Sequence, residues 1–243
     1  MSCYGPLAAW YDQLTGDVPY EEFADFYEAE FRQDGGEFRL LLDLCCGTGT
    51  LTCMLSERGY EMIGVDSSVD MLIQAREKAA QQGQNILFLC QDASELDLYG
   101  TVDAAICSLD GMNYLPGEVL PELFDKLRLF VRPGGLVIFD IRPSDWLHSL
   151  DGEIFVDENE DVLCIWRADY DEDEGAIVYG MDIFTRKGKM WQRSSEEHLE
   201  YAHSEEQLRI VMGNAGFENI RFTSDCPHGD AGRVFVTAKR KEN

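Results

Sequence analysis

Short apolar runs alternate with amphipathic stretches through the first part of the chain. Between Arg39 and Ile141, runs rich in aliphatic residues are separated by segments in which apolar residues recur every three or four positions. Several runs are apolar throughout rather than alternating, which is typical of parallel strands covered by helices on both faces. We therefore expect a doubly wound, mostly parallel sheet with strands at 40–44, 62–65, 86–89, 102–107 and 136–139.

Helix signals lie between these runs. Ser67 and Asp70 have the spacing of a capping box, and an apolar stripe follows them at Met71, Leu72, Ala75 and Ala79. A second amphipathic helix is expected over 119–131, where Pro133-Gly134-Gly135 ends it and turns the chain into the next strand. The aromatic-rich N-terminal stretch predicts two more helices that lean on the sheet.

The pattern changes after Ile141 to one that favours antiparallel strands. Such runs lie at 153–156, 162–170, 176–185 and 189–201, and turn-forming segments separate them. A helix with a capping box at Ser204 and Gln207 then restores the earlier pattern, and two last strands follow. The sequence therefore predicts an α/β fold with a seven-stranded core of residues 1–146 and 203–243, and a small antiparallel β insertion of residues 147–202.

Composition narrows the function classes. The chain has 243 residues and a formal net charge of −26, which repels phosphate backbones and anionic membrane surfaces at long range. We therefore expect no nucleic-acid and no membrane partner. The first residues lack a secretory signal and no apolar run is long enough to span a bilayer, so we expect a cytoplasmic protein.

Cysteine and histidine spacing gives no metal motif. The eight cysteines include Cys3 and Cys226 and contain no CxxC pair, so we interpret them as small buried thiols in a reducing compartment. His148, His203 and His228 have no mutual metal-ligand spacing. We therefore expect no metal.

The segment Asp43-Leu44-Cys45-Cys46-Gly47-Thr48-Gly49 is an apolar strand end that runs into a glycine turn and then a helix. In an open parallel sheet, ligands bind at such carboxyl ends, and Gly47 and Gly49 let the backbone approach a ligand closely. Asp66 ends the second strand at the position of an acid that accepts hydrogen bonds from ribose hydroxyls. These features indicate a nucleoside ligand, and the missing third glycine argues against a dinucleotide.

In this order, the motifs resemble those of the class I S-adenosylmethionine-dependent methyltransferases. Asp43 to Gly49 resembles the first motif, although Cys45 stands where the family usually has glycine. Cys90-Gln91-Asp92-Ala93 is similar to the third motif, around the adenine, and Cys107-Ser108-Leu109-Asp110 to the fourth, beside the methionine part. The resemblance implies a Rossmann-like methyltransferase fold that binds S-adenosylmethionine through Tyr11, Tyr20, Asp43, Cys45, Gly47, Gly49, Asp66, Ser67, Met71, Gln91, Asp92, Ala93 and Cys107.

The N-terminal tyrosines and the β insertion are similar to those of the small-molecule branch, which includes amino-sugar and glycine N-methyltransferases. By this resemblance the insertion covers the substrate site, and Tyr4, Tyr11 and Tyr20 cover the cofactor. The alternative for the tyrosines is packing as core aromatics. The exposed strand edges of the insertion leave both a monomer and a homodimer open.

A sulfonium methyl group is already activated, so catalysis consists chiefly of holding a nucleophile in line and, where needed, accepting a proton. The polar run 190–201 is our preferred pocket wall, with His198 as general base and Tyr201 as a further catalytic candidate. A merely packed histidine is the alternative. With a period of two, Tyr201 and His198 lie on opposite faces of that strand. Asp110, and after it Asn113 and Tyr114, are the second candidates because the fourth motif faces the methyl group.

The function predicted from the sequence is methyl transfer from S-adenosylmethionine to a small-molecule acceptor by in-line displacement. Three alternatives remain: an RNA methyltransferase, a non-catalytic module that binds S-adenosylmethionine, and a nicotinamide oxidoreductase. The net charge of −26 disfavours the RNA enzyme, which needs a basic face.

Overall fold

Seven strands form the larger of two sheets in the computed structural model, which describes residues 4–224 and 232–242. They are β1 (Leu40–Leu44), β2 (Glu61–Asp66), β3 (Leu87–Cys90), β4 (Val102–Cys107), β5 (Val131–Ile141), β10 (Phe217–Thr223) and β11 (Val234–Arg240). Their order in the sheet is β10-β11-β5-β4-β1-β2-β3, and β11 runs in the direction opposite to that of the other six strands. β1 and β4 are apolar and buried because helices cover both faces of the sheet.

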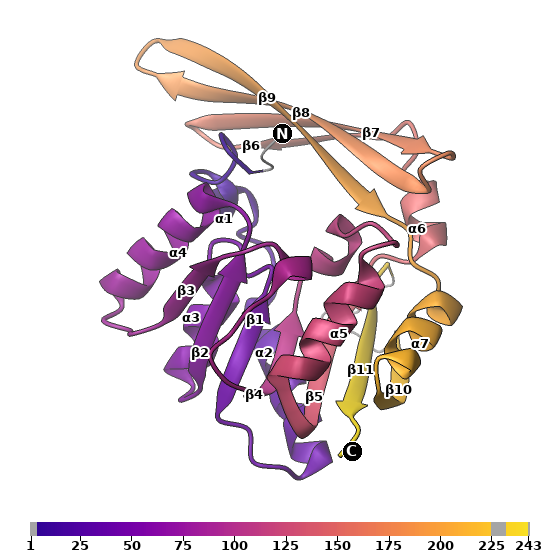
Figure 1. Cartoon of the computed structure of the whole chain (residues 1–243). Helices are drawn as coiled ribbons and strands as arrows, with labels where there is room; N and C mark the ends of the chain where they lie inside the picture. Colours follow the sequence, from indigo (N-terminus) through magenta and orange to yellow (C-terminus); the bar gives the residue numbers. More distant parts are fainter. Residues whose placement is uncertain (1–3, 225–231, 243) are drawn as a thin grey trace.

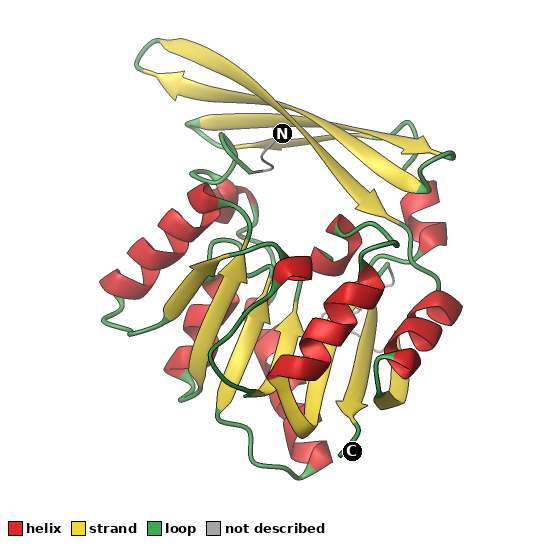
Figure 2. Ribbon diagram, in the orientation of Figure 1, coloured by secondary structure: helices red, strands yellow, loops and turns green. Residues whose placement is uncertain are grey.

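Helices pack on both faces of this sheet (Figures 1 and 2). α2 (Tyr20–Asp34) and α3 (Thr50–Glu57) share one hydrophobic cluster with it, and α4 (Val69–Gln81) packs beside α3 and β3. α5 (Leu120–Phe130) and α7 (Glu205–Asn214) share the other main cluster. Short 3-10 helices, η1 (Ala93–Glu95) and η2 (Gly111–Tyr114), follow β3 and β4. The architecture is the predicted doubly wound α/β fold.

The remaining strands form a separate antiparallel sheet. β6 (Ile154–Glu158), β7 (Val162–Asp171), β8 (Ala176–Lys187) and β9 (Met190–Tyr201) pair in chain order, after the connecting helix α6 (Ser144–Ser149). Figure 1 shows this sheet lying across the carboxyl edge of the parallel strands, with α1 (Tyr11–Leu14) near that edge. The predicted antiparallel insertion is confirmed, whereas the division into domains at 146 and 203 stays a prediction.

Two local predictions were wrong. The N-cap of α4 is Ser68 rather than Ser67, because the Ser68 hydroxyl accepts the Met71 backbone N–H at 3.3 Å. Pro133-Gly134-Gly135 lies inside β5 rather than before it, since the helix already ends at Phe130. A register shift between β4 and β5 accommodates this segment, and a Cβ on Gly135 would lie 2.5 Å from the Asp103 carbonyl oxygen. The glycines therefore allow a bulge within a strand.

The N-terminal segment also differs from the expectation. α2 packs on the seven-stranded sheet, but α1 and the residues before it pack on the second sheet. Leu7, which is 1% exposed, lies in a cluster with Val162, Cys164, Met181 and Ile183. The apolar face of the insertion needs a cover, and this segment supplies it.

Candidate functional site

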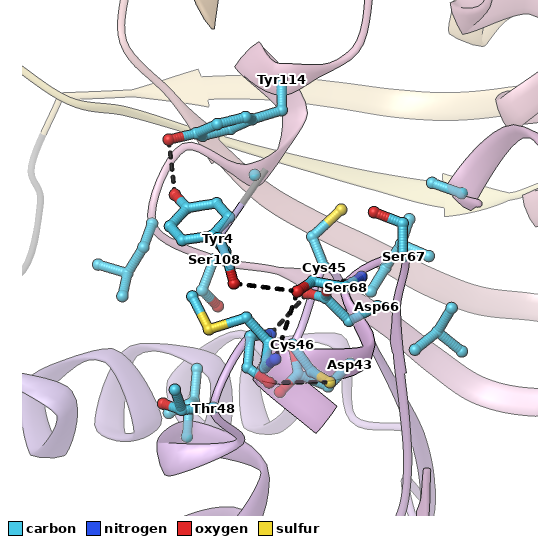
Figure 3. A pocket seen from close by; sticks show the side chains of 18 of the residues that line it. Tyr4, Asp43, Cys45, Cys46, Thr48, Asp66, Ser67, Ser68, Ser108 and Tyr114 are labelled. Carbon is cyan, nitrogen blue, oxygen red and sulfur yellow. Dashed lines mark hydrogen bonds between the residues drawn. The ribbon is translucent and has the colours of Figure 1, made fainter. Parts of the chain in front are cut away.

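A cavity of about 210 Å³ lies at the carboxyl edge of the parallel strands, between them and the N-terminal segment (Figure 3). It is lined by most of the residues that the sequence assigned to cofactor binding: Tyr11, Tyr20, Asp43, Cys45, Gly47, Asp66, Ser67, Met71, Gln91, Asp92 and Ala93. Gly49 and Cys107 do not line it. The residues therefore converge although they come from four segments far apart in the sequence.

Asp43 is a buried carboxyl at the base of the glycine turn. It is 2% exposed, and the hydroxyl of Thr52 donates to it at 2.5 Å. Burial raises its pKa to about 7, despite the lowering effect of the Thr52 hydrogen bond. The floor of the cavity thus holds a group that gains charge near neutral pH and that favours a cationic ligand.

Asp66 joins the two loops that frame the cavity. Its carboxylate oxygens accept the backbone N–H groups of Gly47 and Ser68, each at 2.8 Å (Figure 3). Burial raises its pKa, and these N–H donors lower it. Each carboxylate oxygen has a second lone pair, so Asp66 can still accept a hydroxyl of a ligand.

The two glycines of the turn have different surroundings. Gly47 has φ +53 and no atom within 4 Å of a built Cβ, so open space of the cavity lies beside its backbone. Gly49 has φ +70, and its Cβ would lie 2.9 Å from the Cβ of Ala75. Gly47 is therefore the glycine that allows a ligand to approach, whereas Gly49 serves the packing of α4 against the turn.

Cys45 adopts the left-handed conformation with φ 55, in which glycine is favoured. Its side chain lies beside that of Cys107, and a Cβ on Gly111 would come within 2.9 Å of both. Gly111 therefore leaves room for the cysteine that replaces the usual glycine. Cys107 contributes through this packing and not as a lining residue.

The N-terminal segment is fastened over the cavity at two points. Asp12 accepts the Thr48 hydroxyl at 2.6 Å and pairs with Lys78 at 2.7 Å, which ties α1 to the glycine turn. Glu196 of β9 accepts the backbone N–H groups of Tyr4 and Leu7 at 3.0 and 2.8 Å. The segment thus connects the two sheets and closes the cavity on one side.

The loop after β4 has an unusual backbone. Leu109 and Asp110 both have φ 56, and both backbone N–H groups donate to the fully buried carboxylate of Asp140 at 2.9 Å. Arg233 pairs with Asp140 and with Asp110, the latter at 2.7 Å. Asp110 does not line the cavity, and its carboxylate is engaged in ion pairs that hold this loop.

The catalytic candidates of β9 lie apart from one another. The unbroken register with β8 leaves His198 and Tyr201 on opposite faces, as predicted. His198 is 1% exposed and sits behind the cavity wall, whereas the Tyr201 side chain is half-buried and outside the cavity lining. The backbone carbonyl of Tyr201 accepts the side-chain N–H of Asn113 at 2.9 Å, which ties β9 to η2.

Several lining residues were not assigned from the sequence. Gly111 and Leu115 belong to the loop after β4, where Ser108 and Leu109 had been placed only within the fourth motif and Tyr114 had been only a second candidate. Glu196 was not predicted. With a period of two it lies on the same face of β9 as His198, and this spacing could have suggested that the two side chains interact. Asp140 and Arg233 carried no signal, because only the fold brings β5, β11 and the loop after β4 together.

Within residues 4–224 and 232–242, no three His, Cys, Asp or Glu side chains gather as metal ligands do. The expectation of no metal stays a prediction, since Cys3, Cys226 and His228 lie outside the described residues. The six cysteines inside those ranges are free thiols. No helix in the described part of the chain is long and apolar enough to cross a membrane.

Comparison with known proteins identifies the family. A family model described as "Methyltransferase domain" matches residues 41–135. "Putative methyltransferase YqeM" of Bacillus subtilis (strain 168) is 31% identical over 247 residues, which cover 98% of each chain. A crystal structure of an S-adenosylmethionine-dependent methyltransferase from Clostridium acetobutylicum ATCC 824 is 28% identical. It has a TM-score of 0.85 and covers 99% of this chain and 100% of that one.

A more distant structure shares the fold. The sugar N-methyltransferase KedS8 from Streptoalloteichus sp ATCC 53650 is 19% identical, with a TM-score of 0.81 over 100% of this chain and 97% of that one. S-adenosylmethionine is the cofactor expected for this family, and the cavity fits it, with open space beside Gly47 and with the acids Asp43, Asp66 and Asp92 in the lining, which suit a sulfonium cation. The chain is therefore an enzyme that belongs to the S-adenosylmethionine-dependent methyltransferases.

Proposed function

We propose that the protein transfers a methyl group from S-adenosylmethionine to a small-molecule acceptor inside the cavity beneath the second sheet. The observation that carries this proposal is the closure of the cavity by the N-terminal segment, which Asp12 and Glu196 fasten at its two ends. A cavity covered on one side suits a small acceptor and limits the access of water to the reacting atoms. A polymer would need an open groove.

Cofactor binding is assigned to the residues at the carboxyl edge of β1 to β4. Asp66 would accept the ribose hydroxyls, Gln91 and Asp92 would contact the adenine, and Asp43 would face the methionine end. The bound cofactor supplies a methyl group on a positively charged sulfur. The three carboxyl groups in the lining give the cavity an excess of negative charge that supports this orientation.

The substrate class is supported by two independent features. KedS8, which shares the fold over the whole chain, is a sugar N-methyltransferase by its name. The net charge of −26 disfavours the alternative of an RNA substrate. We therefore propose a small molecule that carries a nucleophilic heteroatom, held in line with the methyl group, with His198 as the proton acceptor.

Calorimetric titration with S-adenosylhomocysteine tests the cofactor assignment. We expect the Asp66→Asn variant to bind at least about tenfold more weakly than the wild type, because a charge-assisted hydrogen bond is lost. Asp125→Asn, at an exposed position of α5, is the matched control and should bind like the wild type. A folded wild type that does not bind would overturn the proposal.

The acceptor class requires a separate assay. Methyl-tritiated S-adenosylmethionine is incubated with the enzyme and either a pool of small amines and alcohols or total RNA. Transfer to the small-molecule pool is the expected result. Transfer to RNA alone would refute the small-molecule assignment and leave the methyltransferase activity standing.

A further inference from the structure

A chain of hydrogen-bonding side chains leads from the cavity wall into the second sheet. The Tyr4 hydroxyl donates to the Tyr114 hydroxyl at 2.6 Å, and the Tyr114 hydroxyl lies 3.4 Å from His198 Nδ1. His198 Nε2 lies 2.9 Å from Glu196 Oε2. Tyr4 and Tyr114 line the cavity and stand together in Figure 3, whereas His198 and Glu196 lie behind them on β9.

Glu196 fixes the direction of this chain. Its two oxygens already accept the backbone N–H groups of Tyr4 and Leu7, so the group acts as a carboxylate acceptor. The proton of the neutral His198 ring therefore lies on Nε2 and points at Glu196, which leaves Nδ1 as the acceptor that faces Tyr114. Every donor along the chain then points away from the cavity.

His198 has no contact with solvent, because its side chain is 1% exposed. The Tyr4 ring packs edge-on against it, with ring centroids 4.3 Å apart, and the Tyr114 ring lies 5.9 Å away. Burial raises the pKa of both tyrosines well above the ordinary value, so each hydroxyl keeps its proton and can pass it on. Among the described residues, the Tyr4 and Tyr114 hydroxyls are the groups that link the cavity wall to His198 Nδ1.

We propose that Tyr4, Tyr114 and His198 form a proton relay that accepts the proton of the methyl acceptor, with Glu196 as the residue that positions and stabilises the imidazolium. The proposal rests on the proposed function and narrows its substrate class to acceptors whose nucleophilic atom X carries a proton, such as an amine or a hydroxyl. Glu196 orients the base His198 as the acid of a catalytic triad orients its histidine, and His198 receives the proton through two tyrosines.

The bonds and charges balance along this path. The X–CH₃ bond forms as the bond between sulfur and the methyl carbon breaks and leaves its electron pair on sulfur. Tyr4 takes the proton of X and passes its own to Tyr114, which passes its proton to His198 Nδ1. The positive charge that begins on sulfur therefore ends on an imidazolium held by the Glu196 carboxylate.

Glu200 is the competing end point for the proton. It is on the same face of β9 as His198, it is buried, and its Oε2 has no hydrogen-bond partner. Glu200 acts on Tyr114 electrostatically and also makes a side-chain hydrogen bond with it, so its carboxyl competes with His198 Nδ1 for the Tyr114 proton. A variant at Glu200 is therefore needed to separate the two routes.

Nitrogen-15 NMR of histidine-labelled protein with bound S-adenosylhomocysteine tests the chain without any acceptor. We expect His198 to show a protonated Nε2 and an unprotonated, hydrogen-bonded Nδ1. Tyr114→Phe should shift the Nδ1 resonance toward that of a free acceptor nitrogen, whereas Tyr60→Phe, at a half-buried tyrosine that packs on the seven-stranded sheet away from β9, should leave it in place. A proton on Nδ1 in the wild type would overturn the proposal.

Kinetics with an acceptor found in the tritium screen give the second readout. Tyr114→Phe and His198→Asn should each lower kcat about 10²- to 10⁴-fold, with S-adenosylhomocysteine affinity within twofold of the wild type. Unchanged rates in these variants, or the same loss in Glu200→Gln with none in His198→Asn, would refute the relay. If the folded wild type does not bind S-adenosylhomocysteine, the proposed function is refuted instead. Failure of the relay and failure of the proposed function are therefore distinguishable.

Discussion

At the scale of single residues, the two glycines after β1 are expected to respond differently to the same substitution. Gly49→Ala places a Cβ 2.9 Å from Ala75, so we expect it to destabilise the protein by about 2–3 kcal/mol. Gly47→Ala adds only the cost of a left-handed alanine, about 1 kcal/mol, but fills the space beside the turn. Urea unfolding and S-adenosylhomocysteine titration of both variants measure the two effects.

The two variants should differ in which property they lose, cofactor affinity or stability. Gly47→Ala should lose most of its cofactor affinity while it stays folded, and Gly49→Ala should lose stability first. Equal losses of stability with unchanged binding in both variants would contradict the assignment of Gly47 to the cofactor.

Asp43 should make stability depend on pH. Its pKa is raised from 3.8 to about 7 by burial, so the folded state prefers the protonated carboxyl. The stability from this group is present below the unfolded pKa and is lost as the pH rises through about 7. Asp43→Asn removes this loss, and between pH 5 and 8 the variant should gain about 3 kcal/mol relative to the wild type.

Urea unfolding of the ligand-free proteins at several pH values measures this difference. Thr52→Val is a useful companion, because it removes the donor that lowers the Asp43 pKa and should therefore extend the loss of stability to higher pH. Parallel pH profiles for the wild type and Asp43→Asn would show that Asp43 stays ionised in the folded state.

The site residues that the sequence could predict are those that follow a parallel strand directly. Asp43, Gly47 and Asp66 were predicted because the carboxyl ends of neighbouring strands meet at one edge, whereas Asp92 was predicted through the resemblance to the family's third motif. Tyr114 and Glu196 gain their roles from contacts across more than 80 positions of the chain, which no local pattern records. Pairings of that kind depend on where the second sheet lies over the first.

At the scale of elements, α1 is expected to act as a fastened cover. Asp12 is half-exposed and its bonds to Thr48 and Lys78 are the ties that hold α1 to the glycine turn. Asp12→Ala should therefore speed S-adenosylhomocysteine dissociation about tenfold and lower the unfolding free energy by no more than about 1 kcal/mol. Stopped-flow dissociation and urea unfolding measure the two quantities.

Asp17→Asn, an exposed acid in the same segment, is the control and should leave the dissociation rate unchanged. An Asp12→Ala variant that releases ligand at the wild-type rate would show that the Glu196 hydrogen bonds and the apolar contacts with β7 and β8 hold the cover without Asp12.

The ends of helices and strands were predictable where the hydrophobic period and the turn-forming residues agree. They were less predictable where the packing of one element on another sets the boundary. β1 and β4 have the predicted ends, and the turns of the second sheet lie within two residues of expectation. β5 begins at Val131 because the chain needs no loop after α5, and the bulge at Gly134 and Gly135 takes up the extra residues. The choice of partner for α1 could not be read from its amphipathic pattern, since either sheet offers an apolar face.

At the scale of the whole molecule, the charge is expected to limit stability at low ionic strength. The formal net charge of −26 on 243 residues produces repulsion across the surface, and only charges closer than the Debye length escape screening. That length falls from about 30 Å at 10 mM to about 8 Å at 150 mM salt. The melting temperature should therefore rise by about 2–4 °C over this range of sodium chloride, the shift that about 1 kcal/mol produces in a protein of this size.

Charge reversal distinguishes repulsion from a general salt effect. Glu160 and Asp173 are exposed and lie in turns of the second sheet, far from the cavity lining. Glu160→Lys and Asp173→Lys each raise the net charge by two, so the double variant carries −22 instead of −26. It should melt higher than the wild type in 10 mM salt and gain less from added salt, with S-adenosylhomocysteine affinity unchanged. An equal salt response in both proteins would mean that bound cations already balance the acidic surface. Repulsion of phosphate-bearing partners by the net charge would then have to be tested by direct binding measurements.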